Sequence, residues 1–279
     1  CMSLFVLLCV IAAALLHATW NALIKTGTDK LTSMMVMTLV QGGFGLGIAI
    51  TRPLPELEVW PWLLASGIFH SAYKIFLGYA YEHGDLSRVY PIARGAAPMI
   101  VLGLSFFLLS DELSQFEYIG VVVLGFGILL MARGVFANAE SARLVPFALG
   151  SALATAGYSI VDGLGARVSG DAIAYVAWLF VWDAFFFTPV CLALRGRGVL
   201  NWEWRVWRTN GLAALASYGA YAIAVWAMTQ APIALVTALR ETSILFAVLI
   251  GWFFFGDRMD RGKVIAVSLI ICGVMLTRL

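Results

Sequence analysis

Residues 94–130 read RGAAPMIVLGLSFFLLSDELSQFEYIGVVVLGFGILL, and residues 240–276 read RETSILFAVLIGWFFFGDRMDRGKVIAVSLIICGVML. A shift of 146 residues superimposes the two stretches. Each then shows an arginine, an aromatic run, a Gly/Ser-Asp turn and a final apolar helix. The corresponding residues are Arg94 and Arg240, Phe107 and Phe253, Asp111 and Asp257, and Gly127 and Gly273. Together with a weaker match of residues 14–27 to 152–165, this repetition predicts two related halves, 1–139 and 140–279.

The composition around these stretches is that of a membrane protein. Of the 279 residues 62% are hydrophobic and only 12% are charged, whereas a soluble domain averages about 25% charged residues. The apolar residues form continuous blocks of roughly 20 residues, twice the length of the alternating strands of a β-barrel. We therefore predict an all-α integral membrane fold of ten transmembrane helices. The expected spans are 3–24, 32–51, 60–81, 88–109, 116–132, 144–163, 172–194, 209–229, 233–255 and 261–278.

The basic residues predict an orientation for these ten spans. Twelve lysines and arginines fall in the odd-numbered loops, and only Arg52, Arg167 and Arg278 fall in the even loops and termini. Positive charge prefers the cytoplasmic side, so we expect odd-numbered loops inside and both termini outside a cell (inner) membrane. Five helices per half is an odd number, so the second half begins on the opposite side of the membrane. The sequence thus predicts an inverted-topology repeat with a site near the midplane.

The pattern of five plus five helices resembles a known family. Its marks are SDEL at 110–113 and GDRM at 256–259, each followed by a glycine-bearing helix. In these features the chain resembles the EamA-type transporters of the drug/metabolite transporter superfamily, and within it the bacterial YddG-type amino-acid exporters. The resemblance covers the whole chain and implies a carrier of small metabolites. Related members carry nucleotide sugars and triose phosphates.

Ionisable side chains inside the spans are candidates for function, because a charge in a bilayer must face protein or water. Those well inside are His17, His70, Lys74, Arg94, Asp183, Arg240 and Glu241, with Asp162 nearer a helix end. Helical spacing groups polar and aromatic side chains on shared faces, and these predict one wet cavity. Hydrogen bonds between helices are the alternative explanation for such faces. The predicted cavity residues are His17, Trp20, Asn21, His70, Tyr73, Lys74, Tyr90, Arg94, Tyr158, Ser159, Tyr221, Arg240 and Glu241.

The charged candidates allow several roles. Arg94 or Arg240 can bind a carboxylate or phosphate bidentately, or can latch a closed gate by pairing with an acid. Glu241 can meet a substrate ammonium or an arginine across the bundle. Asp183 is expected to pair with Lys74 or an arginine, in preference to a proton-relay role. A zwitterionic amino acid suits this set better than a phosphorylated metabolite, for which only Lys74 with Arg94 is expected to converge.

Other classes of protein fit the sequence less well. The three histidines show no HExxH or similar spacing, and the four cysteines form no CxxC pair, so we expect no enzyme, no catalytic residue, no metal and no cofactor. A scaffold or receptor would need a larger extramembrane surface. The expected partners are a small solute and the bilayer, with no nucleic acid, and a monomer or weak dimer. Gly43 with Gly47, and the glycines of the fifth helix, indicate close helix packing, with dimerisation as the lesser alternative.

Overall fold

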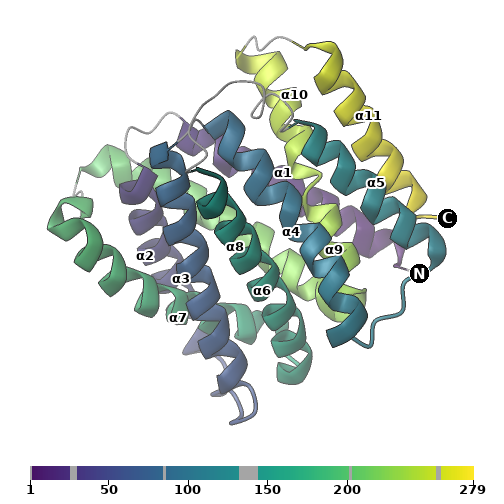
Figure 1. Cartoon of the computed structure of the whole chain (residues 1–279). Helices are drawn as coiled ribbons and strands as arrows, with labels where there is room; N and C mark the ends of the chain where they lie inside the picture. The colour runs from purple at the N-terminus through teal and green to yellow at the C-terminus, as the bar shows by residue number, and fades with distance from the viewer. Residues whose placement is uncertain (1, 26–29, 84–85, 132–143, 201–202, 256–258) are drawn as a thin grey trace.

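The structure is a computed structural model that describes residues 2–25, 30–83, 86–131, 144–200, 203–255 and 259–279. Throughout these ranges the regular elements are helices (Figure 1). Their bounds are α1 Leu4–Lys25, α2 Lys30–Ala49, α3 Trp60–His83, α4 Leu86–Leu108, α5 Gln115–Met131, α6 Leu144–Ser169, α7 Ala172–Arg195, α8 Trp204–Gln230, α9 Ile233–Arg240, α10 Ser243–Phe255 and α11 Arg261–Leu276. A short 3₁₀ turn, η2, spans Gly196–Val199.

Several helices begin where polar side chains satisfy the first free N–H groups. Asp171 accepts from the N–H groups of Ile173 and Ala174 over 2.9 and 3.0 Å at the start of α7. At the start of α5 the Glu117 carboxylate accepts from the Ser114 N–H, and the Ser114 hydroxyl accepts from the Glu117 N–H. This reciprocal pair is a capping box. It fixes the end of the loop that follows α4.

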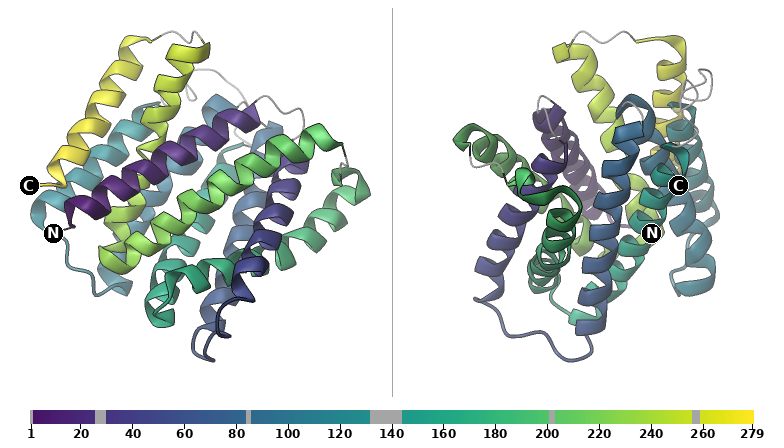
Figure 2. Two further views of the ribbon diagram at one scale, coloured as in Figure 1. Left: turned by 180° about the vertical axis from the view of Figure 1, so that it is seen from behind. Right: turned by 60° about the vertical axis from the view of Figure 1, so that its left-hand side comes forward.

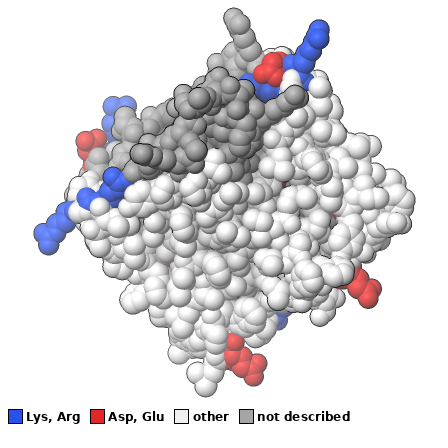
Figure 3. Space-filling model, viewed as in Figure 1, with Lys and Arg blue, Asp and Glu red and all other residues white. Residues whose placement is uncertain are grey.

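Within the described residues, six segments are long and apolar enough to cross a membrane. They lie in α1, α2, α6, α7 with η2, α8, and α9 with α10 taken together. Figure 3 shows one face of the molecule, on which charged side chains lie toward the edges and the surface between them is uncharged. Large apolar side chains are exposed on the helices, such as Phe107 at 80%. An apolar exterior of this kind suits a lipid environment, and the predicted number of ten spans stays a prediction.

The packing pairs helices of the first half with helices of the second. The principal pairs are α3 with α6, α1 with α8, α2 with α7, α5 with α11, and α4 with α6. The view from behind in Figure 2 shows α1 and α8 running side by side. Each half therefore has little opportunity to close a core without the other.

Glycines allow the closest of these contacts. A Cβ on Gly273 of α11 would lie 2.7 Å from the Gly120 carbonyl oxygen of α5, so neither helix tolerates a side chain there. The predicted packing role of the glycines in the fifth helix is therefore confirmed. For Gly43 and Gly47 it is wrong, because a Cβ on either would meet nothing within 4 Å. The neighbouring glycines Gly42 and Gly45 of α2 are the ones that lie against α7.

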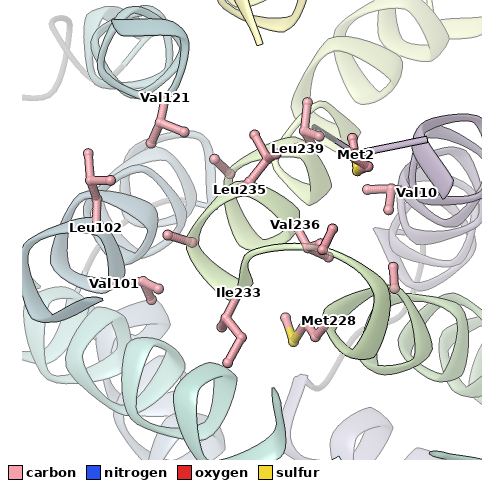
Figure 4. Packing of buried hydrophobic residues seen from close by; sticks show 14 of the residues in the cluster. Met2, Val10, Val101, Leu102, Val121, Met228, Ile233, Leu235, Val236 and Leu239 are labelled. Carbon is pink, nitrogen blue, oxygen red and sulfur yellow. The ribbon is translucent and has the colours of Figure 1, made fainter. Parts of the chain in front are cut away.

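α9 is the centre of the largest apolar cluster. All eight of its residues are buried, and Figure 4 shows Leu235, Val236 and Leu239 surrounded by side chains from α1, α4, α5 and α8. The predicted ninth span, 233–255, is not one continuous helix, because the structure interrupts it between α9 and α10. From the sequence, Pro91 and Pro98 make the fourth helix a hinge candidate. α4 is an unbroken helix from Leu86 to Leu108.

Candidate functional site

The interruption between α9 and α10 places polar backbone in the interior. Glu241 and Thr242 form a turn, and their N–H groups donate to the carbonyl oxygens of Ala238 and Leu239 over 3.0 and 3.1 Å. These bonds reach the third residue back and not the fourth, so the helix tightens and ends at Arg240. The turn is therefore a buried place where a helix C-terminus and a helix N-terminus meet.

An ion pair between the two halves lies at this turn. The Nε of Arg94, in α4, donates to Oε2 of Glu241 over 2.9 Å. The two side chains are only 3% and 2% exposed. Of the two partners expected for Glu241, the structure shows the arginine across the bundle. Two charges buried to this degree are stable only as partners, so removal of either leaves the other uncompensated.

A second arginine and a histidine adjoin this pair. The guanidinium of Arg240 lies 4.9 Å from the ring centroid of Tyr221, in α8, in a cation–π contact. Glu241 interacts electrostatically with both Arg94 and Arg240, and so does His17 of α1. The cations that converge are thus Arg94 and Arg240, and the expectation that Lys74 would converge with Arg94 is wrong.

Some of the polar side chains predicted on one face of the first helix form hydrogen bonds within that helix. The Trp20 Nε1–H donates to His17 Nδ1 over 3.2 Å, and the two rings meet edge to face. The amide of Asn21 donates to the His17 carbonyl oxygen over 2.8 Å. His17 and Trp20 therefore form one unit beside the two arginines, while the Asn21 side chain is bonded to its own helix.

A second polar cluster surrounds Asp162, which is fully buried in α6. Its carboxylate accepts hydrogen bonds from the hydroxyls of Tyr175, at 3.2 Å, and Tyr221. Ser66 is also within hydrogen-bonding reach of it. The Nδ1 of His70 lies 3.9 Å from Oδ2. The His70 ring stacks on Tyr158, with 4.1 Å between the ring centroids. Tyr73 packs edge to face on the same tyrosine.

Lys74 belongs to a different pair. Its Nζ donates to Asp183 in α7 and to the hydroxyl of Thr38 in α2, and lies 4.9 Å from the centroid of Phe187. Asp183 is fully buried. Of the two kinds of partner predicted for Asp183, Lys74 or an arginine, the structure shows Lys74. It joins three helices and does not contribute a cation to the arginine cluster.

At the end of the molecule where α6 stops, an arginine clamps three segments together. Arg167 donates from NH1 and NH2 to the two carboxylate oxygens of Asp111 over 2.7 and 3.1 Å. It also donates to the carbonyl oxygens of Met228 and Ala231, where α8 ends. Asp111 further accepts from the N–H of Ile233, which opens α9. We call these contacts of Asp111 and Arg167 the latch.

The predicted residues fall into distinct groups. His17, Trp20, Arg94, Arg240, Glu241 and Tyr221 surround the turn, and His70, Tyr73, Tyr158 and Tyr221 surround Asp162. The hydroxyl of Ser159 donates to the Thr155 carbonyl of its own helix, so Ser159 is a structural residue. The Tyr90 side chain lies outside the part of the chain that the structure describes.

Sequence reasoning missed other members of these clusters. Ser66 and Tyr175 carried no signal, and Asp162 was noted only as a polar residue near a helix end. Asp111 was visible as part of the repeated turn, but Arg167 entered only as a loop charge. Nothing local to either residue indicates that they meet.

The described ion pairs share one property. Arg52 with Asp171, Lys74 with Asp183, Arg94 with Glu241, and Asp111 with Arg167 each connect residues 1–139 with residues 140–279. The contact of His70 with Asp162, which is an ion pair only when the imidazole is protonated, joins the halves in the same way. Within the described ranges no group of His, Cys, Asp or Glu has the arrangement of a metal site. The arrangement can bind a solute with both signs of charge and can exchange ion pairs between the halves.

Comparison with known proteins gives two findings. The sequence profile described as the EamA-like transporter family matches residues 4–133 and 143–279. One solved protein, described only as a crystal structure of a protein, aligns with a TM-score of 0.78 and 16% identity over 98% of each chain. At that identity the likeness concerns the fold alone. A search of curated proteins finds no match.

Proposed function

Because the chain belongs to the EamA-like transporter family, and is therefore a membrane transporter of small solutes, we propose that it carries zwitterionic amino acids, as YddG-type exporters do. The observation that supports this most is the buried pair of Arg94 and Glu241 at the turn between α9 and α10. The guanidinium is a partner for the substrate carboxylate, and the carboxylate of Glu241 is a partner for its ammonium.

A zwitterion can take the place of this pair without leaving a buried charge alone. When the Arg94–Glu241 bond opens, each side chain finds an opposite charge on the substrate, so the cost of an unpaired ion is avoided. The broken helix favours the same ligand. The C-terminal carbonyls of α9 attract a cation, and the N-terminal N–H groups of α10 attract an anion. A solute that carries only one sign of charge would gain from one half of this arrangement.

A phosphorylated metabolite is the second candidate, because Arg94 and Arg240 both act on the same place. Glu241 interacts with both arginines and lowers the net charge of the three groups to +1. A phosphate monoester carries a charge close to −2 at neutral pH and would be repelled by Glu241. Amino acids are therefore favoured over phosphates, nucleotide sugars and drugs, and a transporting role is favoured over a scaffold.

We further propose that two inverted halves of five spans each rock about this site. The packing is consistent with a repeat in which α1 corresponds to α6 and α3 corresponds to α8. In such a repeat the contact of α3 with α6 corresponds to the contact of α8 with α1, and both contacts are present. Under the 146-residue shift, the contact of Gly127 with the Ala266 carbonyl corresponds to that of Gly273 with the Gly120 carbonyl, and both are present. A pseudo-two-fold axis between the halves would produce such reciprocal contacts.

The direction and location belong to the same proposal. The excess of lysine and arginine in odd-numbered loops supports a cell (inner) membrane location with those loops cytoplasmic. The latch residues, Asp111 and Arg167, then lie on the outer side. Export requires a state in which these contacts have opened.

Purified protein in liposomes tests the substrate. We expect exchange of radiolabelled amino acids, and we expect the neutral double variant Arg94→Gln with Glu241→Gln to lose flux by about tenfold or more, the loss of a charge-assisted bond. The double variant retains hydrogen bonding and leaves neither member of the pair as a lone buried charge, so it can fold normally. Arg197→Ala, at an exposed arginine of η2, is the control and should exchange as the wild type does.

The outcome is decisive in both directions. Full flux in the double variant, or no exchange of any amino acid in a broad panel, overturns the proposal. Competition by phosphate monoesters but not by amino acids would favour the second candidate.

A further inference from the structure

Asp162 is a fully buried carboxylate that the substrate site does not use directly. Its hydrogen-bond donors are hydroxyl groups: Tyr175 and Tyr221, with Ser66 in reach. Within the described residues, the nearest basic group is the imidazole of His70, with Nδ1 3.9 Å from Oδ2. A buried carboxylate held by neutral donors is stable in either protonation state, unlike one bound to a guanidinium.

The imidazole of His70 lies beside this carboxylate and is positioned by Ser66. Its Nδ1 lies 3.1 Å from the backbone carbonyl oxygen of Ser66 and 3.3 Å from the Ser66 hydroxyl. A protonated Nδ1 donates to the carbonyl oxygen, and an unprotonated Nδ1 accepts from the hydroxyl, so both tautomers of the ring have a partner. The ring is held by stacking on Tyr158 and by an edge contact with Tyr221 at 5.3 Å. The imidazole and the carboxylate are thus fixed as a pair from opposite halves of the chain.

Among the described residues, few titratable groups face Asp162. The α3 helix contributes His70, α7 contributes Tyr175, α8 contributes Tyr221, and α6 itself contributes Tyr158. From α9, Arg240 reaches the other face of the cluster through the Tyr221 ring. The arginine of α4, Arg94, is bonded to Glu241, and Arg167 of α6 is bonded to Asp111.

We propose that Asp162 and His70 together bind one exchangeable proton, and that this proton drives transport. The inference rests on the proposed carrier function. The proton comes from water on the side of the latch and is released to water on the other side, so no other reactant is needed. With the proton absent the pair carries one negative charge, and with it bound the pair is neutral.

Tyr221 connects this proton site to the substrate site. Its hydroxyl donates to Asp162 while its ring carries the Arg240 guanidinium, 4.9 Å from the centroid. A protonated carboxyl is a weaker acceptor than a carboxylate, so proton binding loosens Tyr221. Loosening Tyr221 releases the support of Arg240 beside Glu241. Occupancy by a proton and occupancy by substrate are therefore coupled through one side chain.

The latch controls access to the pair. Arg167 lies five residues after Asp162 in α6, which is about 7.5 Å along the helix axis. Asp171, bonded to Arg52, precedes Tyr175 by four residues, or about 6 Å. While these contacts hold, Asp162 is sealed from that end. When they open, water from the same side reaches the carboxylate.

Proteoliposomes separate coupling from transport. Wild-type protein should accumulate amino acid against its gradient when a pH difference is imposed. Asp162→Asn should keep the exchange of amino acid at equal concentrations but lose that accumulation, with the ratio falling to one. Glu112→Gln, at an exposed acid, is the control and should accumulate normally. Accumulation retained by Asp162→Asn overturns the proposal.

Two further outcomes are informative. Wild-type exchange without any response to a pH difference overturns the proton site and leaves the carrier function standing, whereas no wild-type exchange refutes the carrier function. If Asp162→Asn does not fold, His70→Gln decides, because it should shift the pH midpoint of the accumulation driven by a pH difference. An unchanged midpoint in His70→Gln shows a structural role only and overturns the proposal.

Discussion

Lys74 and Asp183 illustrate how a buried pair acts at the scale of single residues. Asp183 is fully buried, and its lysine partner comes from a helix 109 residues earlier in the chain. In a membrane interior neither charge is tolerated alone, but the neutral combination is tolerated. The pair therefore fixes α3 against α7.

This reasoning predicts an asymmetry between single and double substitutions. Lys74→Met leaves the Asp183 carboxylate buried and unpaired, so we expect a loss of about 3–5 kcal/mol of stability. The double variant Lys74→Met with Asp183→Leu should recover most of it. Thermal unfolding in detergent measures both. Equal losses in the single and the double variant would show that the interaction is not an ion pair in the folded protein.

Tyr221 allows a second residue-scale prediction. Tyr221→Phe removes the hydroxyl that donates to Asp162 but keeps the ring under Arg240. The buried carboxylate loses one donor, which costs about 1–3 kcal/mol. Under the proposed proton coupling we expect amino acid exchange to continue while accumulation driven by a pH difference weakens. Flux assays in the presence and absence of that difference distinguish the two effects.

At the scale of elements, the contact between α5 and α11 depends on the absence of side chains. A Cβ on Gly273 would lie 2.7 Å from the Gly120 carbonyl oxygen, so Gly273→Ala must push the helices apart. Overpacking of this kind costs about 1–3 kcal/mol. Gly43→Ala in α2 is the matched control, because its Cβ meets nothing within 4 Å. Replacing a helix-interior glycine there should stabilise by up to about 1 kcal/mol.

Melting temperatures of the two glycine variants in detergent test this contrast. A Gly273→Ala protein as stable as the wild type would contradict the close approach of α5 and α11. A destabilised Gly43→Ala protein would indicate that α2 contacts something outside this chain, such as a second copy.

The break between α9 and α10 is the other element-scale feature. α9 is buried along its whole length, and it ends where two charged side chains face the first half of the chain. A continuous helix would satisfy its own backbone and leave no dipole ends for a ligand. The turn at Glu241 and Thr242 instead brings two helix ends to a buried ion pair.

At the scale of the whole molecule, four described ion pairs connect the two halves, and two of them lie at the end that holds Arg167 and Asp171. Opening this end requires the latch to break. Arg167→Ala removes its four hydrogen bonds at once. The variant should therefore favour the state that is open on this side.

Spin labels on cysteines placed at Glu112 and Gln230, in a background without the native cysteines, report this opening. We expect one short distance between the two labels in the wild type. In Arg167→Ala we expect an additional population of molecules in which this distance is longer. Arg197→Ala, away from the latch, should match the wild type. An Arg167→Ala protein with the wild-type distance distribution would show that the latch does not hold this end closed.

The sequence by itself determined the helices, the apolar exterior and the individual polar candidates. Each of these depends on local properties: the length of apolar blocks, the 3.6-residue period and the rarity of charge inside a bilayer. It predicted an ion-pair partner for Asp183, either Lys74 or an arginine. It also identified Arg94, Arg240 and Glu241 as candidates, although it expected Lys74 to converge with Arg94.

Only the tertiary structure decided which of these groups meet. The Arg94–Glu241 pair spans 147 residues, and the His70–Asp162 contact and the latch also join different halves. Such partners depend on how α3 lies on α6 and α4 on α9, which no local pattern encodes. The break after Arg240 likewise has no proline or glycine to announce it. It exists because the surrounding helices bury α9 and hold its charged end against Arg94.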